Sequence, residues 1–110
     1  MLKKQNRLTK RQFDTHFKSG KRHHGELLTV VHSPADTFHG AVVVGKKIYK
    51  RAVDRNQKRR QIYNALYALY KDTELTGVFI VLSKPGVKQA SFADLSTDLT
   101  RIVGGVLKKR

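Results

Sequence analysis

The sequence predicts a small α+β domain, a two-layer sandwich whose elements follow the order α-β-β-α-β-α over residues 1–110. A chain of 110 residues has room for one domain with one modest core. Apolar residues recur at helical spacing in three segments, and three short Val-rich or Leu-rich runs have the composition of strands. The longest helical segment lies between two of these runs, so we expect it to cross over a mixed sheet of about four strands.

The first half of the chain should form one short helix and two strands. The helix is expected at residues 10–18, where Thr9 can cap its start and Gly20 can end it. Residues 26–32 read ELLTVVH and residues 38–45 read FHGAVVVG, and both are rich in side chains that favour strands. Because only a short turn separates these two strands, we expect them to be antiparallel neighbours.

The longest helix is expected at residues 52–70, which contain neither glycine nor proline. One stripe of this helix starts with two arginines and continues with three apolar side chains: Arg55, Arg59, Ile62, Leu66 and Leu69. The second half should therefore anchor the helix to the core, while the first half presents positive charge. Cations near a helix N-terminus oppose the helix dipole, and a phosphate partner would offset that cost.

The last part of the chain should form a strand and a helix. Residues 77–83 read GVFIVLS, a continuous apolar run that is typical of a strand buried on both faces. Residues 92–107 repeat apolar side chains at helical spacing, and Ser91 with Asp94 can form a capping box at the start.

Positive charge is the strongest compositional signal. Lys and Arg number 23 against eight Asp and Glu, which gives a formal net charge of +15. A small chain with this excess needs a polyanion, and nucleic acid is the first candidate, followed by an anionic membrane surface. The longest apolar stretch, residues 78–82, is too short to cross a bilayer. We therefore expect a cytoplasmic protein with no membrane partner.

The charge is densest in residues 46–60, which we call the basic segment and in which Asp54 is the single acidic residue. Solvated helix faces usually pair acids with bases four residues apart, so a merely solvated face is the less favoured explanation. Arginine can hold phosphate with two hydrogen bonds, and asparagine suits contacts with bases or riboses. The candidate RNA-binding residues are Lys46, Lys47, Arg51, Arg55, Asn56, Lys58, Arg59 and Arg60.

Two groups of aromatic residues have two explanations each. Phe13 and Phe17 are four residues apart and share one face of the first helix. Core packing is the favoured explanation for them, and a stacking platform for unpaired bases is the alternative. Tyr63, Tyr67 and Tyr70 form a stripe on the long helix, which could either line a groove for RNA or form the rim of the core.

The sequence carries no recognisable catalytic or metal-binding motif. It has no Cys, and the spacing of its five His residues matches no metal-ligand pattern. The few carboxylates are scattered, so no pair is visible for two-metal phosphoryl chemistry. We therefore predict no catalytic residue and no metal site in the protein. His23 and His24 are expected to lie in a polar loop, where they could contact RNA.

The order of residues in the basic segment resembles a family signature. Two lysines at residues 46–47 are followed, after a short gap, by RAVDRNQKRR at residues 51–60. This pattern resembles the signature of the bacterial ribonuclease P protein component, roughly K-K and then A-x-x-R-N-x-x-[KR]-R-x-x-R. Residues 7–20 and 78–85 are also similar to that family, so the resemblance covers nearly the whole chain. The last arginine of the signature falls on Tyr63, which is a departure from the pattern.

The resemblance implies the accessory protein subunit of a ribonucleoprotein endonuclease that removes the 5′ leader from precursor tRNA. In that family the RNA subunit is the catalyst and binds most of the Mg²⁺. The implied partners are this catalytic RNA, with one protein per RNA, and precursor tRNA. The residues that would face the catalytic RNA from the central helix are Arg51, Arg55, Asn56, Arg59 and Arg60. The residues that would line a cleft for the single-stranded leader are Phe13, Phe17 and Val31, the last at a position where the family often has an aromatic residue.

A structural RNA-binding protein, such as a ribosomal protein, is the main alternative function. It would share the basic helix, but it has no need for two lysines followed by the R-N-x-x-[KR]-R pattern. A self-sufficient nuclease is disfavoured because the carboxylates are scattered. A DNA-compacting protein is disfavoured because it gives no reason for the helix with two phenylalanines.

Overall fold

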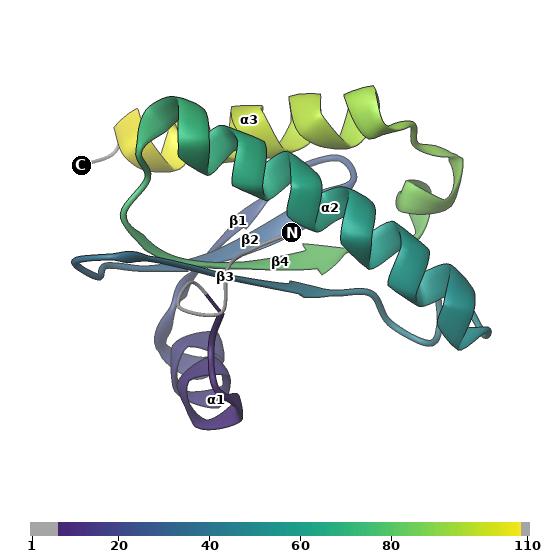
Figure 1. The fold of residues 1–110 in the computed structure, drawn as a ribbon, viewed down its shortest axis with the longest axis horizontal. Coiled ribbons are helices and arrows are strands. Elements are labelled where there is room, and N and C mark those ends of the chain that lie inside the picture. The colour runs from purple at the N-terminus through teal and green to yellow at the C-terminus, as the bar shows by residue number, and fades with distance from the viewer. Residues whose placement is uncertain (1–6, 109–110) are drawn as a thin grey trace.

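The computed structural model describes residues 7–108, and it has the predicted α+β class and a sheet of four strands, one of which the predicted element order did not include (Figure 1). Its elements are α1 (Lys10–Ser19), β1 (Lys21–His24), β2 (Leu28–Ser33), β3 (Phe38–Val43), α2 (Ala52–Thr73), β4 (Gly77–Ser83), the 3-10 turn η2 (Pro85–Gln89) and α3 (Phe92–Lys108). The order is therefore α-β-β-β-α-β-α around a four-stranded mixed sheet.

The strand order in the sheet is β1-β2-β4-β3. Strand β4 pairs antiparallel with β2 and parallel with β3, and α2 makes the crossover between β3 and β4. The expectation that β2 and β3 are antiparallel neighbours is wrong, because β4 lies between them. The physical reason is that β4 is apolar on both faces, so it belongs at the centre of the sheet.

Strand β1 occupies residues that the sequence placed in a polar loop. Its sequence KRHH has no alternation of apolar and polar side chains, and most of it is exposed. The strand forms through backbone pairing with β2, which aligns Arg22 with Val31 and His24 with Thr29. A short, charged outer strand is a common protection for the open edge of a sheet.

Helices α2 and α3 cover one face of the sheet and enclose the main core (Figure 1). The apolar stripe predicted for α2 lies there, with Ile62 and Leu66 fully buried and Leu69 packed at the edge. We call the face of the sheet that α2 and α3 cover the helical face. Helix α1 packs on the opposite face, against a smaller cluster of Val31, Val78 and Ile80, and we call that face the α1 face.

The tyrosine stripe of α2 forms the rim of the core. Tyr63, Tyr67 and Tyr70 are half-buried and pack against the main core. The Tyr63 hydroxyl accepts a hydrogen bond of 3.3 Å from the backbone N–H of Val42, and Tyr70 stacks on Phe38 with ring centroids 4.4 Å apart. Of the two explanations for these tyrosines, the structure supports the rim of the core.

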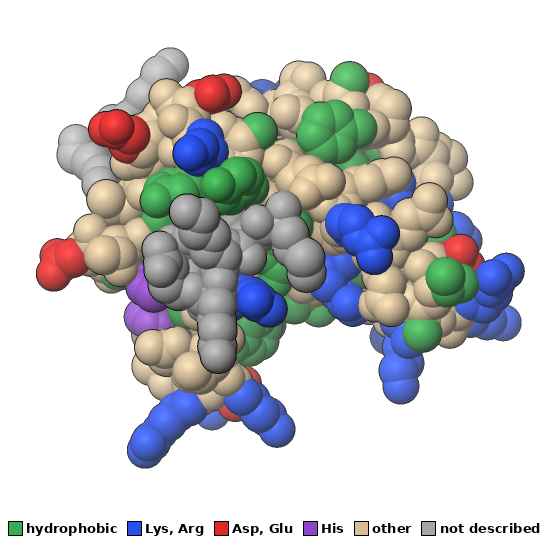
Figure 2. Space-filling model, viewed as in Figure 1, with side chains coloured by type: hydrophobic (Ala, Val, Ile, Leu, Met, Phe, Trp, Pro, Cys, Tyr) green, Lys and Arg blue, Asp and Glu red, His purple; other side chains and the backbone are tan. Residues whose placement is uncertain are grey.

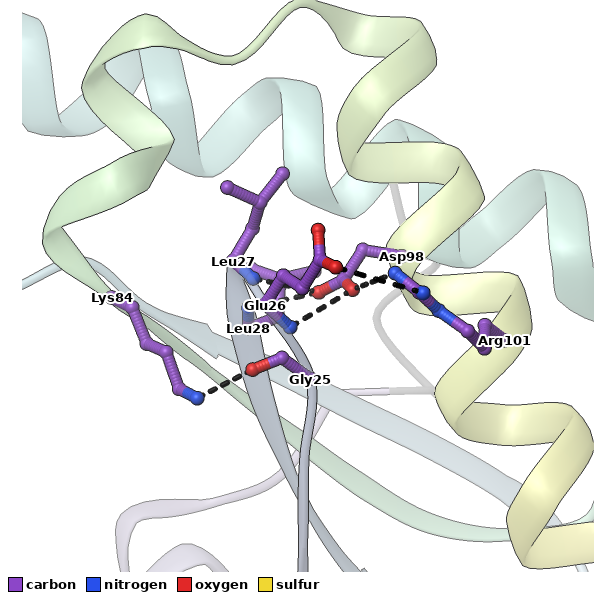
Figure 3. Close-up of polar contacts among 7 residues, drawn as sticks. All are labelled: Gly25, Glu26, Leu27, Leu28, Lys84, Asp98 and Arg101. Atoms are coloured by element: carbon purple, nitrogen blue, oxygen red, sulfur yellow. Dashed lines mark hydrogen bonds and ion pairs between the residues drawn. The ribbon is translucent and has the colours of Figure 1, made fainter.

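A buried carboxylate ties α3 to the chain that enters β2 (Figure 3). Asp98 is 2% exposed and accepts hydrogen bonds of 3.0 to 3.1 Å from the backbone N–H groups of Glu26, Leu27 and Leu28. Arg101 adds a bond of 2.8 Å to the same carboxylate. Burial alone would raise the pKa of Asp98. The hydrogen bonds from the three backbone N–H groups and from Arg101 outweigh burial and hold the pKa below its ordinary value.

Gly25 makes this close approach possible. A Cβ atom at this position would lie 2.5 Å from Ile102 and 2.7 Å from the Asp98 carboxylate. The turn that presents the three N–H groups to Asp98 therefore has no room for a side chain at residue 25. The Lys84 ammonium donates to the Gly25 carbonyl and holds the turn from its other side (Figure 3).

Candidate nucleic-acid interface

The basic segment joins β3 to α2 and continues through the first turns of that helix. Lys46, Lys47, Arg51, Asn56 and Arg60 are exposed there. Figure 2 shows Lys and Arg side chains projecting from this end of the molecule, on the right of the view. The N-cap of α2 makes no side-chain hydrogen bond, so the N–H groups of the first turn add to the positive potential.

Arg55 has a structural role within this surface. It is half-buried, and its guanidinium donates hydrogen bonds to the carbonyls of Tyr49 (3.0 Å) and Lys50 (2.8 Å). These bonds fix the path of the chain into α2. Arg55 therefore shapes the turn that carries Lys46 and Lys47, and this guanidinium nitrogen is engaged within the protein.

Two other predicted residues of α2 also contact the protein itself. The Lys58 ammonium lies 3.1 Å from Gln61 Oε1 and 3.3 Å from the Ala90 carbonyl, so it joins α2 to the chain before α3. Arg59 donates to Asn56 Oδ1 at 2.7 Å, which orients both side chains on the helix surface. The structure thus separates the eight candidates into exposed groups and groups that also hold the fold.

Acidic side chains leave most of this charge uncompensated. Within residues 7–108, the basic segment contains one ion pair, Arg51 with Asp54 at 3.6 Å. Both side chains are well exposed, so water and salt screen this pair and it stabilises the fold little. The concentration of positive charge that the sequence predicts is therefore present as an accessible surface.

The two phenylalanines of α1 attach this helix to the sheet. Phe13 and Phe17 stack with ring centroids 5.6 Å apart, and both are half-buried against the cluster that contains Val31. Val31 itself is 1% exposed, so in this structure it supports the rings from below and presents no accessible surface. The rings combine core packing with a partly exposed surface, and their contact with a leader stays a prediction.

The α1 face continues beyond the helix as a row across all four strands. The strand register aligns His24, Thr29, Leu82 and Val43 in this row. His24 lies 3.2 Å from the Thr29 hydroxyl at one end, and Val43 is exposed at the other. Figure 2 shows the molecule hollowed on this side, between α1 and the start of α2, with Lys and Arg side chains on both flanks.

Arg22, on the outer strand β1, was not among the residues predicted from the sequence. Its guanidinium carbon is 4.7 Å from the centre of the Phe17 ring, a cation–π distance. A polar tetrapeptide gives no apolar alternation from which to assign a strand. The available signal was the pair of cations directly after Gly20, which was too general to predict this contact.

Neither a metal centre nor a membrane span is evident in the described part of the chain. Across residues 7–108, no three side chains of His, Cys, Asp or Glu come together as metal ligands would. None of the helices between residues 7 and 108 is both long and apolar enough to cross a membrane.

Comparison with known proteins identifies the family. A family model described as Ribonuclease P matches residues 2–106, almost the entire chain. The chain belongs to the ribonuclease P protein family. The ribonuclease P protein component of Nitratiruptor sp. is 28% identical over 102 residues, covering 93% of this chain and 92% of that protein. The component of Rickettsia akari is 27% identical over 106 residues, covering 84% and 89%.

Solved structures of ribonuclease P proteins share this fold. The Staphylococcus aureus RNase P protein superimposes with a TM-score of 0.75 at 19% identity, covering 92% of this chain and 94% of that one. The Thermotoga maritima protein gives a TM-score of 0.71 at 21% identity, covering 86% and 92%. At this level of identity the superpositions establish the fold, including the four-stranded sheet between α1 and the two longer helices.

Proposed function

We propose that this chain is the protein subunit of the ribonucleoprotein endonuclease that removes the 5′ leader from precursor tRNA. The observation that carries the proposal is the exposed, uncompensated basic segment beside a sheet face with aromatic side chains, in a chain of the ribonuclease P protein family. The basic segment binds the phosphates of the catalytic RNA. The α1 face holds the single-stranded leader, to which aromatic rings and cations are both suited.

In this proposal the catalytic RNA performs the hydrolysis and holds most of the Mg²⁺. The protein lowers the repulsion between two RNA molecules, since each phosphate contact by Lys or Arg releases counterions from the RNA. One protein acts with one catalytic RNA, and the complex works in the cytoplasm.

Reconstitution at limiting Mg²⁺ tests the function. The protein is mixed with a bacterial ribonuclease P RNA and a precursor tRNA, and release of the 5′ leader is followed. We expect no cleavage by the protein alone, and acceleration by about tenfold or more over the RNA alone, because concentrated cations favour association of the two RNAs. Polylysine at equal charge is the control for general neutralisation. A protein that binds the RNA without accelerating cleavage would instead be a structural RNA-binding protein.

Replacing Phe13 by Leu tests the leader-binding role of the α1 face. Leucine keeps apolar packing on the sheet but removes the aromatic surface, so thermal stability should change little. Stacking of one base is worth about 1–3 kcal/mol, and we expect the affinity of the holoenzyme for precursor tRNA to fall about tenfold. Phe92→Leu on α3 is the matched control, since Phe92 is 47% exposed on a different layer. Equal affinity of both variants for precursor tRNA would remove Phe13 from the binding surface.

A further inference from the structure

Arg22 lies where the α1 face meets the outer edge of the sheet. Its partner residue in the ladder is Val31, so its side chain is on the same face as the rings of α1. The preceding residue, Lys21, pairs with His32 and points to the opposite face. The guanidinium of Arg22 is over the Phe17 ring, and this contact favours that orientation of an exposed side chain.

The charge of Arg22 has no acidic partner in the described structure. The ion pairs within residues 7–108 join Arg51 to Asp54 and Arg101 to both Glu26 and Asp98. Glu26 lines the same pocket as Arg22, and it is paired with Arg101 at 3.9 Å. An exposed guanidinium without an acidic partner can donate hydrogen bonds to a phosphate without first breaking an internal ion pair.

Arg22 also covers part of the ring that would otherwise meet a base. Phe17 has Phe13 as its stacking partner at 5.6 Å and the guanidinium at 4.7 Å. A strand of RNA that arrives at this point meets a planar cation, which can bind phosphate through its fork and can stack on a base. Arg22 is thus better placed than Phe17 to contact the RNA at this edge.

The position of Arg22 at the β1 edge of the sheet determines which part of the leader it can reach. Strand β3 leads into the basic segment, whereas β1 is the outermost strand on the other side. Three strand spacings, roughly 14 Å, separate the two edges. Arg22 also lines a pocket of about 490 Å³ between β1 and α3, together with residues that include His24 and Arg101. A leader that crosses the sheet from the basic segment therefore reaches Arg22 with the nucleotides farthest from the basic segment, which we call the distal leader.

We propose that Arg22 binds a phosphate of the distal leader, so that this side chain adds affinity only for precursor tRNAs whose leaders are long enough to cross the sheet. This inference rests on the function proposed above, and it adds one residue to the leader-binding surface. The cation binds the sugar–phosphate backbone, so the contribution of Arg22 depends on the length of the leader and not on its base sequence.

The test measures binding of precursor tRNAs with stepwise longer leaders to the reconstituted holoenzyme. Arg22→Met removes the charge but keeps an unbranched side chain that can pack on Phe17. Arg22→Lys keeps the charge, and Lys21→Met is the matched control, because it removes one charge from the same strand but from the opposite face. We expect Arg22→Met to lose about tenfold in affinity for long leaders and nothing for the shortest one. Arg22→Lys should retain most of the affinity.

The salt dependence gives a second measurement. For long leaders, the slope of log affinity against log salt should fall by about 0.7 in Arg22→Met and stay unchanged in Lys21→Met. Equal binding of long leaders by both Met variants would overturn the inference, and so would a loss in Arg22→Met that is independent of leader length. If the unmodified protein does not improve binding of any precursor tRNA over the RNA alone, the proposed function itself fails. That result differs from a failure of Arg22 alone.

Discussion

Replacing Arg51 and Arg60 together by Gln should weaken binding of the catalytic RNA about a hundredfold. Both side chains are exposed in the basic segment, and a hydrogen bond to a charged group contributes about 1.5 kcal/mol or more. Two such contacts amount to about 3 kcal/mol, which corresponds to this change in Kd. Binding titrations at several salt concentrations provide the measurement, and the salt slope should fall by about two if the RNA is helical at the contact.

The choice of these two arginines follows from the contacts of Arg55. A substitution at Arg55 would remove its bonds to Tyr49 and Lys50, so a loss of RNA binding would mix lost charge with a displaced turn. The matched control is Lys18→Gln with Lys71→Gln, which removes two exposed charges from α1 and from the last turn of α2. If this control loses as much affinity as the test variant, general charge and not the basic segment binds the RNA.

The sequence predicted the parts of the fold in which side-chain periodicity determines the structure. Ile62 and Leu66 repeat at helical spacing and are fully buried, and the run at residues 77–83 forms the central strand. Strand β1 could not be predicted in this way, because its stability comes from backbone pairing with β2 and its side chains face solvent. The sheet order was also wrong, because adjacency in sequence suggested a hairpin and the pairing of β4 with both β2 and β3 excludes it.

The candidate site was predictable as a region and less so residue by residue. The density of cations in the basic segment is visible from composition, but the engagement of Arg55 and Lys58 depends on carbonyls of Tyr49, Lys50 and Ala90. Those carbonyls are placed by the turn before α2 and by the start of α3, which no local pattern specifies. For the same reason the buried role of Asp98 could not be predicted from the sequence, because its donors lie about 70 residues earlier in the chain.

Asp98→Asn should lower the free energy of unfolding by about 3 kcal/mol at neutral pH. The carboxylate accepts from three backbone N–H groups and Arg101, and an amide cannot accept all of these bonds. Leaving a buried donor without a partner costs about 1–3 kcal/mol, and the amide NH₂ also faces N–H groups at close range. Urea denaturation at neutral pH measures the difference.

The pH dependence of unfolding distinguishes the contribution of the Asp98 charge to stability from the contribution of its packing. Because folding lowers the pKa of this carboxyl from its ordinary value of 3.8, the stabilisation is complete above that value. It is lost as the pH falls through the lower pKa of the folded state. The gap between the unmodified protein and Asp98→Asn should therefore be constant above about pH 5 and narrow in acid.

An exposed carboxylate supplies the control for this experiment. Asp72→Asn removes an acidic side chain near the end of α2, where it is solvated, and stability should change by less than about 0.5 kcal/mol. If Asp98→Asn unfolds at the same urea concentration as Asp72→Asn, the three N–H groups do not depend on the carboxylate. If its gap to the unmodified protein is instead independent of pH down to strong acid, the loss comes from packing of the altered side chain. If the buried charge of Asp98 holds α3 against the start of β2, the difference in free energy of unfolding must be large at neutral pH and must decline in acid.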